Sequence, residues 1–293
     1  MIDAQRTAAT HAFVITKESH RMEYATEIMV DDLVFPECPR WHEGALWFAD
    51  VHAHRVMRVG ADRQPETMVE HRQPAGLGWT PDGALLFVAM VDRALMRADE
   101  GGVRQVADLS SLEPCQLNDM VADAHGNAYI GGFGFDINRG EAVRASSVYF
   151  VRASGEARVA ADEMMFPNGL VITAEGRTLI VAETVGRRLT AFDIAADGAL
   201  SGRRVWASLD VFPDGICLDT DGAIWVASPV TGECVLVHEG GDVVRRIKAR
   251  ANGVYACALG GDDGRTLYLC TANTTGPELA EGRSVGWVER VRV

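Results

Sequence analysis

The chain has 293 residues, of which 47% are hydrophobic and 24% charged, and it contains 30 glycines. This composition is typical of a globular protein rich in turns and argues against a disordered or fibrous one. The 41 acidic and 28 basic residues give a formal net charge of −13, which argues against nucleic acid and anionic membranes as partners because both repel an anion.

The opening segment, residues 1–22, has no counterpart elsewhere in the chain. It lacks the uninterrupted apolar core of a signal peptide, and no stretch approaches the roughly 18 to 20 apolar residues of a membrane helix. We expect an N-terminal extension, disordered or forming an outer cap, on a cytoplasmic protein. The six cysteines form no Cys-x-x-Cys pair, so we interpret them as reduced thiols, with a disulfide framework as the alternative.

From residue 23 to residue 293 one pattern recurs six times: a turn ending in glycine, a strand, a polar gap and a second strand. The turn glycines, in chain order, are Gly44, Gly83, Gly126, Gly176, Gly222 and Gly264. Subtracting successive positions gives spacings of 39, 43, 50, 46 and 42 residues, close to the roughly 40 to 50 residues of a four-stranded propeller blade. The sequence therefore predicts an all-β fold, a single-domain six-bladed β-propeller.

A surplus segment precedes the first repeat. Residues 27–35 read EIMVDDLVF and are typical of a strand, whereas the last repeat ends in GWVERVRV. We expect the first segment to pair with the last repeat, because this pairing closes the ring and removes an open sheet edge.

Polar residues recur seven or eight positions before the turn glycines, where the innermost strand of each blade should begin. Four of the six repeats have a side-chain oxygen there, in Glu37, Asn118, Asn168 and Asp214, whereas the second repeat has Gly76. Because a propeller superposes equivalent positions around its axis, we expect these oxygens to converge.

Glu37, Asn168 and Asp214 share a frame, since each follows a Phe-Pro dipeptide. Two carboxylates and an amide that face one another would repel and remain poorly satisfied unless a cation lay between them. Hard oxygen ligands favour Ca²⁺, Mg²⁺ or Mn²⁺, and Zn²⁺ is a further alternative. The competing interpretation is that Asn-Gly and Asp-Gly are turn dipeptides, but Glu37 precedes Cys-Pro and is not explained by turn chemistry.

These motifs resemble those of the senescence-marker-protein/gluconolactonase family, also called the regucalcin family, from about residue 27 to the C-terminus. The matching segments are ECPRWHEGALWFAD, QLNDMVADAHGNAYIGG, FPNGLVIT, FPDGICLDTDGAIWVA and YACALGGDDGRTLYLCTA. The resemblance implies a six-bladed propeller in which Glu37, Asn168 and Asp214 bind one divalent ion on the axis, with Ca²⁺ as the expected ion.

The resemblance also implies a substrate site. It places Asn118 and Asp119 at an Arg-x-Asn-Asp motif that contacts substrate, and it aligns Asp136 with an acidic residue that meets substrate hydroxyls. The arginine of that motif is Gln116 here, so a cationic contact is lost and we expect a lactone more apolar than a polyol.

The expected activity is metal-dependent hydrolysis of a small lactone or other ester. The ion would polarise the carbonyl, and Asp214 would act as general base toward water. The alternatives are aryl-ester or phosphotriester hydrolysis at the same site, or a non-catalytic calcium-binding or ligand-binding propeller. We expect a monomer or weak homo-oligomer with no nucleic-acid or membrane partner.

Overall fold

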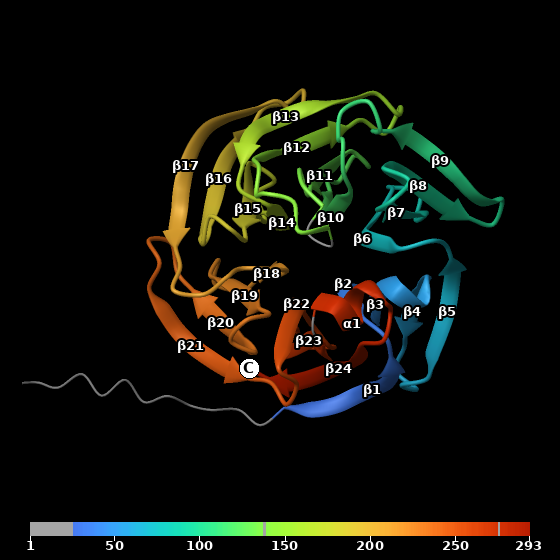
Figure 1. The fold of residues 1–293 in the computed structure, drawn as a ribbon, viewed down its shortest axis with the longest axis vertical. Helices are drawn as coiled ribbons and strands as arrows, with labels where there is room; N and C mark the ends of the chain where they lie inside the picture. The colour runs from blue at the N-terminus through green and yellow to red at the C-terminus, as the bar shows by residue number, and fades with distance from the viewer. Residues whose placement is uncertain (1–25, 137–138, 275) are drawn as a thin grey trace, which may run out of the picture.

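The computed structural model describes residues 26–136, 139–274 and 276–293. The predicted extension, residues 1–22, lies outside the described residues. The described residues form six antiparallel sheets of four strands each, arranged as blades around a central axis (Figure 1). The predicted all-β six-bladed propeller is confirmed. None of the helices in the described ranges is long and apolar enough to span a membrane.

The first three blades follow one another in the chain. Blade 1 comprises β2 (Pro36–His42), β3 (Ala45–Asp50), β4 (Arg55–Val59) and β5 (Pro65–Glu70), with the short 3₁₀ helix η1 (Val51–Ala53) after β3. Blade 2 comprises β6 (Pro74–Trp79), β7 (Leu85–Ala89), β8 (Ala94–Asp99) and β9 (Gly102–Asp108). Blade 3 comprises β10 (Leu117–Ala122), β11 (Ala128–Gly132), β12 (Ser146–Val151) and β13 (Ala157–Met164).

The last three blades complete the ring. Blade 4 comprises β14 (Pro167–Ile172), β15 (Thr178–Glu183), β16 (Arg188–Ile194) and β17 (Leu200–Ser208). Blade 5 comprises β18 (Ile216–Leu218), β19 (Ile224–Ser228), β20 (Glu233–Val237) and β21 (Val243–Lys248). Blade 6 comprises β22 (Gly253–Gly260), β23 (Thr266–Asn273), β24 (Val285–Arg292) and β1 (Glu27–Leu33), with the short helix α1 (Gly276–Ala280) before β24.

The ring closes through the two ends of the described chain. β1 pairs antiparallel with β24, from Glu27 opposite Arg290 to Leu33 opposite Gly286, and so forms the outermost strand of blade 6. The predicted pairing of residues 27–35 with the last repeat is confirmed. It joins the first and last segments of the propeller in one sheet, which pairs the outer edge of β24, completes blade 6 to four strands and holds the first blade against the sixth.

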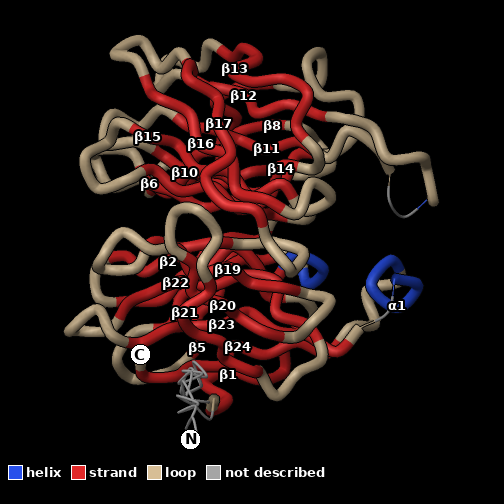
Figure 2. Tube along the Cα trace, turned by 90° about the vertical axis from the view of Figure 1, so that its left-hand side faces the viewer, coloured by secondary structure: helices blue, strands red, loops and turns tan. Residues whose placement is uncertain are grey.

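The turns between the first and second strands confirm the repeat. All six predicted turn glycines have a positive φ, between 67° and 84°, which glycine adopts at little cost. These turns lie at one end of the innermost strands, β2, β6, β10, β14, β18 and β22, and the candidate site residues lie at the other. Figure 2 shows η1 and α1 projecting from one face of the disc.

The cores lie between neighbouring blades, where apolar faces of adjacent sheets pack together. Trp225, Tyr129, Tyr149 and Phe48 are fully buried there. Burial of this kind is the main stabilising contribution, at roughly 25 cal/mol per Å² of apolar surface removed from water. The packing fixes each blade against the next, so the innermost strands are held rigidly around the axis.

Close backbone approach near the axis explains the glycines that follow Asn168 and Asp214. Neither Gly169 nor Gly215 has a positive φ, and Asn168 and Gly169 lie within β14, so these dipeptides are not turns. A Cβ on Gly169 would lie 2.5 Å from the nitrogen of Ile216, and one on Gly215 would lie 2.5 Å from the Cβ of Ala256. The turn interpretation of Asn-Gly and Asp-Gly is therefore wrong.

Candidate functional site

The three predicted ligands lie at equivalent positions of three blades. Glu37 and Asn168 are the second residues of β2 and β14, and Asp214 directly precedes Gly215 at the start of the innermost segment of blade 5. The amide of Asn168 and the charge of Glu37 both act on the Asp214 carboxyl group, so the three side chains lie close to one another. The structure thus brings together all three residues that the repeat pattern singled out.

Irregular pairing shapes the same end of the innermost strands. Register shifts occur between Glu37 and Arg40 in β2, between Leu117 and Met120 in β10, and between Pro167 and Leu170 in β14. β6 and β22 have shifts at corresponding places. Because a bulge redirects the side chains around it, these irregularities turn the residues at the strand starts away from ordinary sheet alternation.

Both carboxyl groups have strongly raised pKa values. Burial raises the pKa of Glu37 to about 8, and the nearby Asp119 adds to the rise, whereas the N–H of Cys38 and the charge of Arg40 oppose it. Burial and the charge of Glu37 hold the pKa of Asp214 well above its usual range, against the hydrogen bond from Asn168. Asp214 is buried and Glu37 partly buried, and two such carboxylates that disfavour each other's ionisation need a proton or a cation between them.

The amide of Asn168 is oriented by its neighbours. Its Nδ2 donates to Oγ1 of Thr184 at 3.2 Å, and that hydroxyl donates to the carbonyl of Pro213 at 2.7 Å. These two hydrogen bonds identify the Nδ2 side of the amide as the donor side. The Oδ1 atom is therefore the atom available to coordinate a cation.

The donor set fits a hard divalent cation. Glu37 and Asp214 supply two carboxylates with a formal charge of −2, and Asn168 supplies a neutral amide oxygen. In the ranges that the structure describes, no group of three or more His, Cys, Asp or Glu side chains is suited to a metal ion. A cation held by Glu37 and Asp214 would have the Asn168 amide oxygen as its third protein donor.

A partly buried ion pair joins blades 1 and 3 beside this set. Arg40 Nη2 lies 2.7 Å from Asp119 Oδ1 and donates to the carbonyl of Met120 at 2.5 Å, although the two residues come from blades 1 and 3. Asp119 Oδ1 also accepts from the N–H of Met120 at 2.7 Å. These contacts give Asp119 a partner within the protein, and the substrate contact that the family resemblance implies for it stays a prediction.

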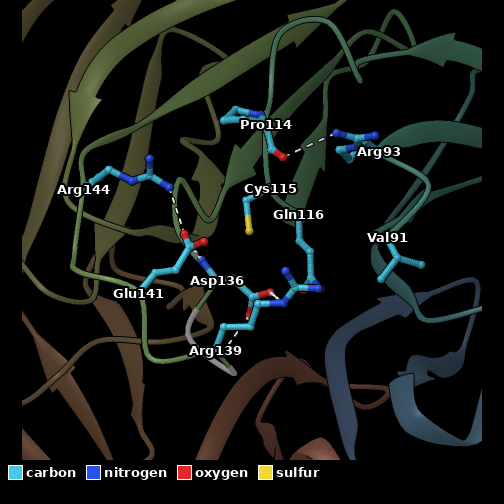
Figure 3. A pocket seen from close by; sticks show the side chains of 9 residues that line it. All are labelled: Val91, Arg93, Pro114, Cys115, Gln116, Asp136, Arg139, Glu141 and Arg144. Carbon is cyan, nitrogen blue, oxygen red and sulfur yellow. Dashed lines mark hydrogen bonds and ion pairs between the residues drawn. The ribbon is translucent and has the colours of Figure 1, made fainter.

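The other three predicted substrate residues come from blade 3 and the segments beside its first two strands. Asn118 occupies the position of Glu37 in blade 3 and its Nδ2 donates to the carbonyl of Pro167 at 3.3 Å. Gln116 and Asp136 both line a pocket of about 340 Å³ between blades 2 and 3 (Figure 3). Asp136 forms an ion pair with Arg139 at 3.3 Å.

Buried carboxylates hold the segments that lead into the innermost strands, and the sequence analysis did not identify them. Each accepts backbone N–H bonds from such a segment: Asp50 from Phe35 at 2.8 Å, Glu113 from Cys115 at 2.8 Å, Glu183 from Met165 at 2.7 Å and Glu289 from Ala251 at 3.1 Å. All four acids are 0% exposed. The signal that could have found two of them is their equivalent place, because Asp50 and Glu183 are each the last residue of the second strand of a blade.

Tyr255 is a further neighbour of the axial carboxyl groups. Burial raises its pKa to about 12, and the charges of Asp214 and Glu37 add to the rise. Its ring packs edge-on against Phe35 with a centroid separation of 4.7 Å. The phenol therefore stays protonated at neutral pH and is a hydrogen-bond donor beside the axial site.

Comparison with known proteins identifies a family. The family model described as SMP-30/Gluconolactonase/LRE-like region matches residues 35–273. A pentonolactonase of Haloferax volcanii is 29% identical over 255 residues, which are 82% of this chain and 82% of that protein. A 6-deoxy-6-sulfogluconolactonase of Pseudomonas putida is 26% identical over 272 residues, which are 89% of this chain and 91% of that protein.

A solved structure has the same fold. The calcium-binding protein regucalcin from Agrobacterium tumefaciens superposes with a TM-score of 0.77 at 19% identity, over 92% of this chain and 94% of that one. This likeness supports the propeller fold. The family match over most of the propeller is a separate observation, and it shows the family.

Proposed function

The chain belongs to the SMP-30/gluconolactonase/LRE-like family, and on this premise we propose that it is a metal-dependent lactonase. Two relatives with lactonase names, each matching more than four fifths of the chain, support lactone hydrolysis as the activity. The observation that supports the site most strongly is that the carboxyl groups of Glu37, which is partly buried, and Asp214, which is buried, lie close to each other and to the Asn168 amide.

Glu37, Asn168 and Asp214 would hold the ion, and we propose Ca²⁺ because the regucalcin with this fold is a calcium-binding protein. A divalent ion held there supplies Lewis-acid polarisation of an ester carbonyl. The raised pKa values of Glu37 and Asp214 fit this role, because binding a cation relieves the repulsion that otherwise retains a proton.

The chain's own residues would then guide the hydrolysis. Asp214 accepts a proton from a water molecule, whose oxygen attacks the carbonyl carbon of the lactone. The bond between that carbon and the ring oxygen breaks, the ring oxygen takes up the proton, and a hydroxy acid is released. Asn118, at the corresponding position of blade 3, would orient the substrate through its amide. The phenol of Tyr255 would donate a hydrogen bond to the substrate.

The six cysteines are all described and none is in a disulfide. Four of them are buried, and burial raises the pKa of Cys257 and Cys270 well above the usual range, so these thiols are unreactive. Unpaired thiols suit a reducing compartment, and we propose the cytoplasm as the location.

Turnover of a lactone panel by chelated protein, before and after metal is restored, tests the proposed function. We expect sugar lactones to be hydrolysed only after Ca²⁺ or another divalent ion is added. Hydrolysis of aryl esters or phosphotriesters in preference to every lactone would contradict the assigned reaction. Metal binding without any hydrolysis would instead favour a calcium-binding propeller.

A further inference from the structure

The pocket between blades 2 and 3 is connected to the proposed active site through the segment that enters β10. Gln116, one of its lining residues, lies two positions before Asn118 on the segment that enters β10. Glu113, which is fully buried, fixes this segment by accepting hydrogen bonds from the N–H of Cys115 at 2.8 Å and the hydroxyl of Tyr149 at 2.9 Å. The pocket therefore has a rigid wall and a fixed position beside the axis.

The charges of this pocket differ in sign from those of the whole chain. Three arginines line it, Arg93, Arg139 and Arg144, against two carboxylates, Asp136 and Glu141, so the lining has a net charge of 3 − 2 = +1. The chain as a whole has a net charge of −13. A locally basic pocket in a strongly acidic protein favours an anionic ligand at that place.

The three arginines are not equally neutralised. Arg139 lies 3.3 Å from Asp136, and Arg144 lies 2.9 Å from Glu141, on one side of the pocket (Figure 3). Arg93 lies across the pocket from them, and its Nη1 donates to the backbone carbonyls of Glu113 and Pro114, each at a long 3.4 Å. Its charge also acts on Asp108, a carboxylate outside the pocket lining. The Nε of Arg93 is buried and has no hydrogen-bond partner among the described residues.

We propose that this pocket binds an anionic group of the substrate, a carboxylate, sulfonate or phosphate, and that Arg93 is its principal contact. The proposal rests on the proposed lactonase function and specifies its substrate class as lactones with a negative charge away from the ester. The family motif has an arginine at the position of Gln116. In this chain the arginines of the pocket would supply that positive charge from other positions. This replaces the expectation of a more apolar lactone.

A matched pair of lactones tests the proposal. D-glucaro-1,4-lactone has a carboxylate where D-glucono-1,4-lactone has a hydroxymethyl group, and both rings carry the same ester. With Ca²⁺-loaded protein we expect a KM about tenfold lower for the charged lactone, because a charge-assisted hydrogen bond of ordinary strength gives about that factor. Arg93→Met should remove this preference and change the KM of the neutral lactone less than about twofold.

Control variants separate the subsite from general charge effects. Arg152→Met removes an arginine that pairs with Glu156 outside this pocket, and it should leave the preference intact. Gln116→Arg adds a cation to the same pocket and should increase the preference, which keeps the test decisive if the Arg93 variant does not fold. Equal KM values for the two lactones in the unmodified protein would overturn the proposal, as would a preference that neither pocket variant alters.

Calorimetric titration with the ring-opened hydroxy acids distinguishes a failure of this proposal from a failure of the proposed function. If no lactone is hydrolysed, the lactonase assignment fails, and the subsite is tested by titrating the metal-loaded protein with D-glucarate and with D-gluconate. Tighter binding of D-glucarate that weakens in Arg93→Met would support the subsite. Equal affinity for the two acids would overturn it.

Discussion

Replacing Glu37 with glutamine removes one of the two carboxyl groups of the proposed metal site and leaves the size of the side chain nearly unchanged. Burial, with Asp119 adding to it, raises the pKa of Glu37 from 4.5 to about 8. The folded protein therefore binds this proton more tightly than the unfolded chain. The stability that protonation contributes is present at low pH and is lost as the pH rises from about 4.5 through about 8.

The size of this effect follows from the two pKa values. A rise from 4.5 to about 8 corresponds to roughly 5 kcal/mol when the group is fully ionised. Linkage then predicts that metal-free protein loses roughly 3 to 4 kcal/mol of unfolding free energy between pH 5 and pH 8 because of Glu37. The Glu37→Gln variant lacks this loss, and it also relieves the repulsion that raises the pKa of Asp214.

Urea unfolding in a chelator, followed by tryptophan fluorescence across this pH range, measures the difference. Near pH 8 we expect the metal-free variant to be more stable than the metal-free original protein. Added Ca²⁺ at about 100 times its Kd should stabilise the original protein by about 2.7 kcal/mol and the variant by much less. Glu70→Gln, at an exposed position of β5, is the matched control and should change neither result. Parallel pH profiles for the original protein and Glu37→Gln would refute the reasoning.

Two further substitutions test the residues around the axis. Asp214→Asn should lower kcat by about 10² to 10⁴ in steady-state assays on a lactone, because it removes the proposed base, and full turnover with metal bound would contradict that role. Arg40→Met leaves the buried Asp119 without its cation and should cost about 3 to 5 kcal/mol in urea unfolding. A cost below about 1 kcal/mol would show that the pair contributes little, and Arg40→Met combined with Asp119→Leu should recover part of the loss.

The architecture was predictable because it depends on local signals that repeat. Each turn glycine needs a positive φ, so its spacing along the chain reports the length of a blade. The surplus strand at residues 27–35 was predictable because an open ring leaves an unpaired edge. Glu37, Asn168 and Asp214 were predictable for the same reason, since circular symmetry places equivalent positions around one axis.

The contacts that cross between blades were not predictable. Arg40 and Asp119 are 79 residues apart, and their 2.7 Å contact depends on the register and tilt of two separate sheets. The pairing of Glu289 with Ala251 also joins distant positions. The turn interpretation of Asn168-Gly169 stayed open as an alternative because Asn-Gly is ambiguous locally, and only the packing against Ile216 shows why a side chain is excluded at Gly169.

The basic pocket was missed for a related reason. Gln116 suggested the loss of a cation when one position was considered alone. Arg93 and Arg144 reach the same space from a different blade and from the loop after β11, which only the folded chain reveals. Charge at a site is therefore better judged from all the segments that surround it than from one motif position.

Stoichiometric titration of lactone turnover with Ca²⁺ tests the central claim most directly. Protein stripped of metal is titrated while hydrolysis of D-glucono-1,4-lactone is followed. We predict that activity rises from near zero and reaches its plateau when one ion is bound per chain. Undiminished hydrolysis by the stripped protein, with no response to added Ca²⁺, Mg²⁺, Mn²⁺ or Zn²⁺, would contradict the account.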